Sequence, residues 1–216
     1  MNRAFEMFKK HKFAAILRNI PENKIENTAR ALYRGGARIF EITFNPSDSD
    51  TVSKTANAFE IIKNACGNEI CIGAGTVVKK EYVSVAKSFG AEFIVSPNTD
   101  AEVISLTKMH GMLSVPGAFT PTEIMAAKSF GADIVKIFPI EPHNISYLKN
   151  ILAPLSHIPF ITTGGVNENT AAQFMKLGAV ALAAGAAVIP VSALENNDFS
   201  VIEQKTAALI NIIKNA

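Results

Sequence analysis

The stretch FGADIVKIF at residues 130–138 joins a glycine, typical of a helix end, to a β-branched run, typical of a buried strand. Three related stretches occur elsewhere: GGARIF at 35–40, FGAEFIV at 89–95 and LGAVALAAG at 177–185. Because the same helix-to-strand junction recurs along one chain, the sequence predicts an array of repeated half-units rather than two unrelated lobes.

The rest of the chain continues this alternation of short apolar runs and longer amphipathic stretches. Predicted strands lie near residues 13–17, 38–43, 70–74, 93–95, 112–115, 134–138, 159–161 and 180–184. Predicted helices lie near residues 22–35, 48–65, 79–89, 99–110, 120–130, 144–153, 167–177 and 197–214. Parallel strands linked by right-handed crossovers close into a barrel when there are eight of them. We therefore predict an α/β fold with one domain over residues 1–216: a single (β/α)8 TIM barrel with a short N-terminal helix.

A doubly wound open sheet is the alternative fold. It is disfavoured because no G-x-G-x-x-G follows the first predicted strand, which ends instead in Leu17-Arg18-Asn19.

Composition narrows the range of partners and locations. The 216 residues are 48% hydrophobic and carry a net charge of +2, with no basic stripe, which argues against a nucleic-acid partner. The N-terminal segment contains no apolar run long enough for a signal peptide or a membrane span, so we expect no membrane association and a cytoplasmic location. Cys66 and Cys71 form neither a disulfide framework nor a zinc set, and we expect them to be reduced.

Polar, glycine and proline residues collect where the predicted strands end. In a barrel enzyme, the carboxyl ends of the strands and the loops that follow them carry the chemistry. The residues at these ends, in chain order, are Arg18; Glu41 and Thr43; 73–76; 96–98; 116–117; Lys136 and Phe138; 162–165; and 185–186.

Lys136 lies inside a strand of β-branched residues, where an unpartnered lysine is rarely buried. On a period of two, it shares its face with Ile134 and Phe138. One interpretation is a lysine that extends to the barrel mouth or pairs with a carboxylate. The other is a nucleophile, which needs a lowered pKa because only about one lysine in 2,500 is neutral at pH 7 at the ordinary pKa. A neutral amine can attack a ketone and form an imine.

Glu41 is an acid within an equally apolar strand and shares its face with Ile39 and Thr43. It is either an ion-pair partner of Lys136 or Arg18, or a proton-transfer group. The second and sixth predicted strands are not neighbours, yet their inward side chains would meet at the mouth of a barrel. The sequence therefore predicts a carboxyl group and an amine across one cavity.

Gly164-Gly165 precedes the helix predicted to begin near Asn167, which suggests backbone N–H groups aimed at an anion. The loops after the seventh and eighth strands are the usual phosphate site of these barrels. The residues 73–76, GAGT, lack the Gly-Lys-Ser/Thr ending of a nucleotide-binding loop. Of the four histidines only His143 falls near the predicted mouth, so a metal-dependent mechanism is disfavoured.

Taken in order, these motifs resemble the 2-keto-3-deoxy-6-phosphogluconate (KDPG) and 4-hydroxy-2-oxoglutarate (KHG) aldolase family over roughly residues 5 to 190. The motifs are AILR (15–18), GG (35–36), EIT (41–43), GAGTV (73–77), IVSP (94–97), PG (116–117), TPTE (120–123), KIFP (136–139) and TGGVN (163–167). Each motif alone is weak, but the ordered set is specific.

The resemblance implies a homotrimeric barrel that needs no metal or organic cofactor and takes a small-molecule 2-keto acid. It implies that Lys136 is the Schiff-base lysine and Glu41 the proton-transferring carboxylate. The implied substrate ligands are Arg18, Thr76, Pro97, Phe138, Thr163, Gly164, Gly165, Gly185 and Ala186, and Thr163 matches the gluconate-type members.

Two residues depart from the family pattern. Asn45 stands where the family commonly has an arginine four residues after the glutamate, and a longer approach to the next helix, 47–50, follows it. Ala186 stands where the family often has a serine that could hold a phosphate oxygen. These departures leave carboxylate binding to Arg18 and Thr76 and weaken the expectation of a phosphorylated substrate.

We therefore expect a class I aldolase that cleaves a 4-hydroxy-2-keto acid to pyruvate and an aldehyde. The expected substrates are 2-dehydro-3-deoxy-6-phosphogluconate, which yields glyceraldehyde 3-phosphate, and 4-hydroxy-2-oxoglutarate, which yields glyoxylate. The alternatives are a phosphosugar isomerase or epimerase on a related barrel, and a non-catalytic metabolite-binding barrel.

Overall fold

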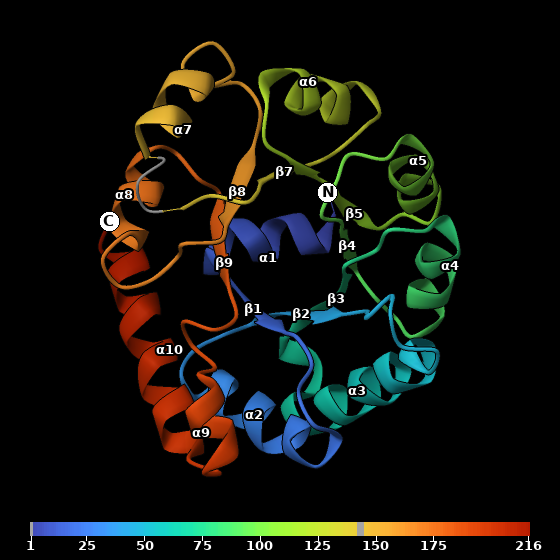
Figure 1. Ribbon diagram of the computed structural model, residues 1–216, viewed down its shortest axis with the longest axis vertical. Helices are drawn as coiled ribbons and strands as arrows, with labels where there is room; N and C mark the ends of the chain where they lie inside the picture. The colour runs from blue at the N-terminus through green and yellow to red at the C-terminus, as the bar shows by residue number, and fades with distance from the viewer. Residues whose placement is uncertain (1, 142–144) are drawn as a thin grey trace.

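A computed structural model describes residues 2–141 and 145–216 and shows a ring of parallel strands surrounded by helices (Figure 1). The strand order is β5-β4-β3-β2-β1-β9-β8-β7-β6. The strands are β1 Phe13–Leu17, β2 Ile39–Thr43, β3 Cys71–Gly75, β4 Phe93–Val95, β5 Leu113–Val115, β6 Gly117–Ala118, β7 Val135–Ile137, β8 Phe160–Thr163 and β9 Ala181–Ala184. The predicted barrel is confirmed.

The ninth strand arises because the fifth predicted strand is divided at Pro116. Its first part, β5, pairs with β4, and its second part, β6, pairs with β7. Proline cannot donate a ladder hydrogen bond, but its carbonyl still accepts one from the Lys136 N–H at 2.8 Å. The segment 113–118 therefore joins the two ends of the sheet, and the ring has eight strand positions.

The helices that cover the ring follow the predicted order. They are α1 Arg3–His11, α2 Glu22–Arg34, α3 Thr51–Cys66, α4 Lys80–Ser88, α5 Ala101–Met109, α6 Pro121–Ser129, α7 Ile145–Leu152, α8 Ala171–Lys176, α9 Val191–Glu195 and α10 Phe199–Lys214, with a 3₁₀ turn η1 at Gly67–Glu69. Helix α9 and the 3₁₀ turn were not predicted. Residue 144, where the sixth crossover helix was predicted to begin, and His143 lie outside the described residues.

One helix differs in a way that concerns the candidate site. Helix α8 begins at Ala171, four residues later than predicted. The Thr170 hydroxyl donates to the Gly165 carbonyl at 2.7 Å and accepts from the Asn167 N–H at 3.0 Å, so these residues form a turn. The prediction that Gly164 and Gly165 lie directly before a helix is therefore wrong.

Two apolar clusters hold the barrel together. The larger one lies between the strands and the outer helices, and it includes Val135 and Ile137. The smaller one fills the barrel interior and includes Ile39, Phe93 and Ile134. Helix α1 crosses behind the ring of strands in Figure 1, and its buried Phe8 packs edge-on against Phe93 with ring centroids 5.1 Å apart. The amino-terminal end of the barrel is thus filled by apolar side chains, which leaves the opposite end for polar groups.

Within the described residues, every helix is either too short or too polar to span a bilayer. Cys66 and Cys71 are both free thiols and both buried.

Candidate active site

The strand period places two charged side chains inside the carboxyl end of the barrel. Lys136 on β7 follows Ile134 by two residues, and Glu41 on β2 follows Ile39 by two, and both isoleucines belong to the interior cluster. Because side chains alternate along a strand, Lys136 and Glu41 point inward as well. The prediction that they face one interior space agrees with this geometry.

Lys136 is buried, with 6% of its surface exposed. Burial, together with the positive charge of Arg18, lowers the pKa of Lys136 to about 8, and the Glu41 charge opposes that shift. Its Nζ atom lies 4.7 Å from the centroid of the Phe138 ring. At a pKa of about 8, about one Lys136 side chain in ten is neutral at pH 7, against about one in 2,500 at the ordinary value.

Glu41 is enclosed to a similar degree, at 4% exposure. Burial raises the pKa of this carboxyl group, and the charges of Lys136 and Arg18 offset part of the rise. Desolvation therefore pushes the acid and the amine in the same direction, toward their neutral forms. A raised pKa makes this carboxyl group a stronger base when it is ionised than an ordinary glutamate, and burial keeps more of it in the protonated form that can give a proton.

Gly75 provides the space that the Glu41 carboxyl group occupies. A Cβ atom on Gly75 would lie 2.0 Å from Glu41 Oε1 and 2.7 Å from its Cδ. No side chain larger than hydrogen fits at residue 75 while Glu41 keeps its position. The sequence motif GAGT contained this glycine, but nothing in the sequence linked it to the acid.

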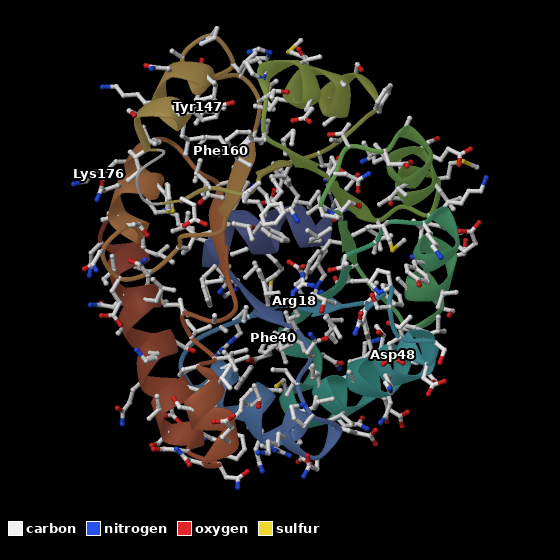
Figure 2. The ribbon with its side chains drawn as sticks, in the orientation of Figure 1. Arg18, Phe40, Asp48, Tyr147, Phe160 and Lys176 are labelled. Atoms are coloured by element: carbon white, nitrogen blue, oxygen red, sulfur yellow. The ribbon has the colours of Figure 1, made fainter. Side chains whose placement is uncertain are left out.

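Arg18 and Thr76 meet at the ends of β1 and β3. The Arg18 guanidinium donates to the Thr76 hydroxyl at 3.0 Å, and Figure 2 shows Arg18 on the inner side of the ring of strands, close to β1 and β2. Thr76 has a left-handed backbone (φ 57°), which is uncommon for a β-branched residue. The Arg18 charge acts on both Lys136 and Glu41, so Arg18, Glu41 and Lys136 share one electrostatic environment.

Thr163 ends β8, and its buried hydroxyl has no hydrogen-bond partner among residues 2–141 and 145–216. A buried hydroxyl without a partner is destabilising, and a bound substrate oxygen would remove that penalty. The next residue, Gly164, has a φ of 93°, and a Cβ atom there would lie 3.0 Å from the Ile140 carbonyl oxygen. This glycine lets the loop after β7 approach the end of β8 closely.

The other predicted ligands also lie at carboxyl ends of strands. Pro97 follows β4 and is partly buried. Gly185 follows β9, where an added Cβ would lie 3.1 Å from the Ile16 carbonyl oxygen, and the adjacent Ala186 is exposed. Among the described residues, no cluster of histidine, cysteine, aspartate and glutamate could hold a metal ion.

A buried amine of lowered pKa beside a buried acid, at the carboxyl end of a (β/α)8 barrel, is the arrangement of an enzyme that captures a carbonyl compound as an imine. The family model for KDPG and KHG aldolases matches residues 5–205. The chain belongs to this family of class I, pyruvate-type lyases.

Relatives and solved structures agree with this assignment. The 2-dehydro-3-deoxy-phosphogluconate aldolase of Treponema pallidum is 32% identical over 86% of this chain and 87% of its own. The 2-dehydro-3-deoxy-6-phosphogalactonate aldolase of Escherichia coli is 34% identical over 76% and 78%. A structure described as native KDPGal superimposes with a TM-score of 0.81 at 30% identity over 94% of each chain.

A more distant structure shows the fold alone. KDPG aldolase from Legionella pneumophila, with pyruvate captured as a covalent carbinolamine, has a TM-score of 0.81 at 22% identity over 96% of this chain and 98% of its own. The relatives from Treponema pallidum and Escherichia coli are both aldolases, which gives no support to the isomerase or non-catalytic alternatives.

Proposed function

We propose that this chain cleaves 4-hydroxy-2-keto acids reversibly to pyruvate and an aldehyde, with Lys136 as the imine-forming residue. The observation that carries the proposal is the burial of Lys136, because burial lowers the pKa of its amine to about 8 in a space shared with Glu41. The Treponema pallidum relative, named for a phosphogluconate substrate, supports the same reaction class.

In the proposed reaction, the neutral Lys136 amine attacks the C2 ketone to form a carbinolamine. Protonated Glu41 then gives a proton to the carbinolamine hydroxyl group, which leaves as water, so that a protonated imine and an ionised Glu41 remain. The imine cation accepts the electron pair of the C3–C4 bond while Glu41 removes the proton of the C4 hydroxyl group, directly or through a water. The aldehyde leaves, and the remaining enamine takes a proton at C3. Hydrolysis of the imine then releases pyruvate and restores the amine.

Arg18 and Thr76 are proposed to hold the substrate carboxylate, with Pro97 and Phe138 as walls of the pocket. Their hydrogen bond at 3.0 Å holds a guanidinium in place for an anion. The Thr163 hydroxyl, which lacks a partner within the part of the chain that the structure describes, is proposed to bind a substrate hydroxyl group. Gly164, Gly165, Gly185 and Ala186 are proposed to contact the far end of the substrate.

The aldehyde half is tested with a panel of substrates. 2-Dehydro-3-deoxy-6-phosphogluconate, its galactonate epimer, the unphosphorylated forms of both and 4-hydroxy-2-oxoglutarate are each incubated with the enzyme, and pyruvate is measured. We expect pyruvate from at least one of the five and none with Lys136→Ala. Glu41→Gln is expected to slow cleavage about 10²–10⁴-fold, the usual effect of losing a general acid or base. A failure of all five substrates to yield pyruvate would contradict the proposal.

The chain is also proposed to fold as one domain and to act as a homotrimer in the cytoplasm. Two free, buried cysteines are consistent with a reducing compartment. Light scattering should give about three times the chain mass of 23.2 kDa, and a mass near that of one chain would contradict the trimer.

A further inference from the structure

Thr76 is held in a backbone conformation that its residue type disfavours. Its φ of 57° lies in the left-handed region, where a β-branched residue is rarely found. The preceding residue, Gly75, faces Glu41 inside the barrel, since a Cβ atom there would meet the Glu41 carboxyl group. Regular alternation would therefore direct Thr76 outward, toward the helices. The left-handed turn breaks this alternation, and the Thr76 hydroxyl instead accepts from Arg18, which lies on the inner side of the ring (Figure 2).

Hydrogen bonds to the neighbouring strand ends fix the backbone on both sides of Thr76. The Gly75 carbonyl accepts from the Phe44 N–H at 2.9 Å, which fixes the peptide group before Thr76. After it, the Val77 N–H donates to the last carbonyl of β4 at 3.1 Å, and the Val77 carbonyl accepts from the Ser96 hydroxyl at 2.8 Å. The first two are backbone bonds that almost any residues could make, whereas the third depends on the side chain of Ser96.

Ser96 acts from behind the site. It is buried, with 2% of its surface exposed, and it follows β4, whose last residue belongs to the interior cluster. Because side chains alternate along a strand, Ser96 points away from the barrel interior, toward Val77 of the outer cluster. Its hydroxyl therefore lies behind the backbone that lines the substrate space. What it can change is the position of Thr76 and, through Thr76, that of Arg18.

We propose that Ser96 is a positioning residue for recognition of the substrate carboxylate. By holding the Val77 carbonyl, its hydroxyl keeps Thr76 in the left-handed conformation and so presents Thr76 and Arg18 to the carboxylate. The inference rests on the proposed function, because it gives Ser96 a role in binding the same 2-keto acid. It concerns affinity for the carboxylate group and leaves the chemistry of Lys136 unchanged.

The test compares pyruvate with methyl pyruvate, which has the same ketone but no negative charge. The full chain is incubated with a low concentration of each compound and with cyanoborohydride, which reduces the imine, and the initial rate of adduct formation is followed by mass spectrometry. The carboxylate preference is the ratio of the two rates, in which any change in the reactivity of Lys136 cancels. Ser96→Ala should lower this ratio about 2- to 12-fold, the range for one lost hydrogen bond.

Three further variants separate positioning from a general loss of structure. Ser114→Ala is the matched control, because Ser114 is also 2% exposed and lies on the adjacent strand β5, and it should leave the ratio unchanged. Ser96→Cys keeps a similar shape with a weaker donor, so it should lower the ratio by less than Ser96→Ala, and it carries the test if Ser96→Ala does not fold. Thr76→Gly removes the side chain that Ser96 positions, so adding Ser96→Ala to it should lower the ratio no further.

The outcomes that contradict the role of Ser96 differ from those that contradict the aldolase reaction. An unchanged ratio in Ser96→Ala, an equal fall in Ser114→Ala, or a further fall when Ser96→Ala is added to Thr76→Gly would overturn the inference alone. If the original chain formed no adduct with pyruvate, the proposed function would fall and the inference with it.

Discussion

Lys136 and Glu41 lie inside the same barrel, where burial disfavours the ionised form of each side chain. Burial is the largest cause of both pKa shifts, and the opposite charges of the two groups reduce the shifts without cancelling them. A lysine at the protein surface would remain almost wholly protonated at pH 7 and could not attack a ketone at a useful rate. The barrel interior therefore supplies the property that imine formation needs.

The pH dependence of catalysis follows from the Lys136 amine. Because its folded-state pKa is lowered to about 8, kcat/KM should rise about tenfold per pH unit below that value and level off above it. This rising part of the pH profile of kcat/KM is its acid limb, and two variants should move the limb in opposite directions along the pH axis. Arg18→Leu removes a positive charge that lowers the Lys136 pKa, so the limb moves to higher pH. Glu41→Gln removes a negative charge that raises it, so the limb moves to lower pH. A limb near 10.5 in the original chain would contradict this account.

Gly75→Ala tests whether the space beside Glu41 matters for proton transfer. The added methyl group would lie 2.0 Å from Glu41 Oε1, so the carboxyl group must move. We expect kcat to fall about 10²–10⁴-fold, as for loss of the acid itself. Glu41→Asp shortens the acid, so the double variant should lose less activity than the two single losses combined. Additive losses would show that Gly75 affects the enzyme in another way.

At the scale of elements, the sequence pattern predicted strand positions better than it predicted turns. β1 and β4 have the predicted bounds, since each is a short apolar run closed by a polar or proline-containing segment. The break at Pro116 and the late start of α8 were missed. Both depend on hydrogen bonds that only the folded chain forms, such as the Thr170 hydroxyl on the Gly165 carbonyl.

The candidate site also has features that the sequence pattern predicted and features that it did not. The period of two along a strand was enough to predict that Lys136 and Glu41 point into the barrel. The fit of Glu41 over Gly75 was not predictable, because it depends on the distance between a side chain on β2 and the backbone of β3.

The start of helix α6 allows a test of how a capping motif in the sequence stabilises a helix. Thr120 and Glu123 form a capping box at its start, and N–H groups of Thr120 and Phe119 lower the pKa of the Glu123 carboxyl group. Thr120→Ala should reduce the free energy of unfolding by about 0.5–2 kcal/mol in a urea titration. Thr122→Ala, inside the same helix and exposed, is the control.

Glu123 adds a pH dependence to that helix. Its folded-state pKa lies below the ordinary 4.5, so its contribution is present above pH 4.5 and is lost as the pH falls through the folded-state value. Glu123→Gln should therefore destabilise the chain at pH 7 and make little difference at low pH. An equal loss at both pH values would contradict the capping role.

At the scale of the whole molecule, the two ends of the barrel have different tasks. Helix α1 and the interior cluster fill the amino-terminal end with apolar side chains, and the carboxyl end carries the polar groups. The filled end fixes the strands whose other ends hold Lys136 and Glu41. Stability and chemistry are therefore separated along one axis.

Phe8→Ala tests this separation. Phe8 is fully buried against Phe93, so its removal should lower the free energy of unfolding by about 3–5 kcal/mol. At a temperature where the variant remains folded, the pH at the midpoint of the kcat/KM limb should not move, because Phe8 lies at the far end from Lys136. A shift of that midpoint would mean that the two ends are coupled.

The central claim, that Lys136 forms an imine with a 2-keto acid, is tested most directly by trapping. The chain is incubated with pyruvate and borohydride between about pH 6 and 9, and the product is digested and weighed by mass spectrometry. We predict an increase of about 72 Da on the peptide that contains Lys136, the mass of a reduced pyruvate imine, and none in Lys136→Met. The absence of an adduct at every pH, or an adduct on another lysine that persists in Lys136→Met, would contradict the account.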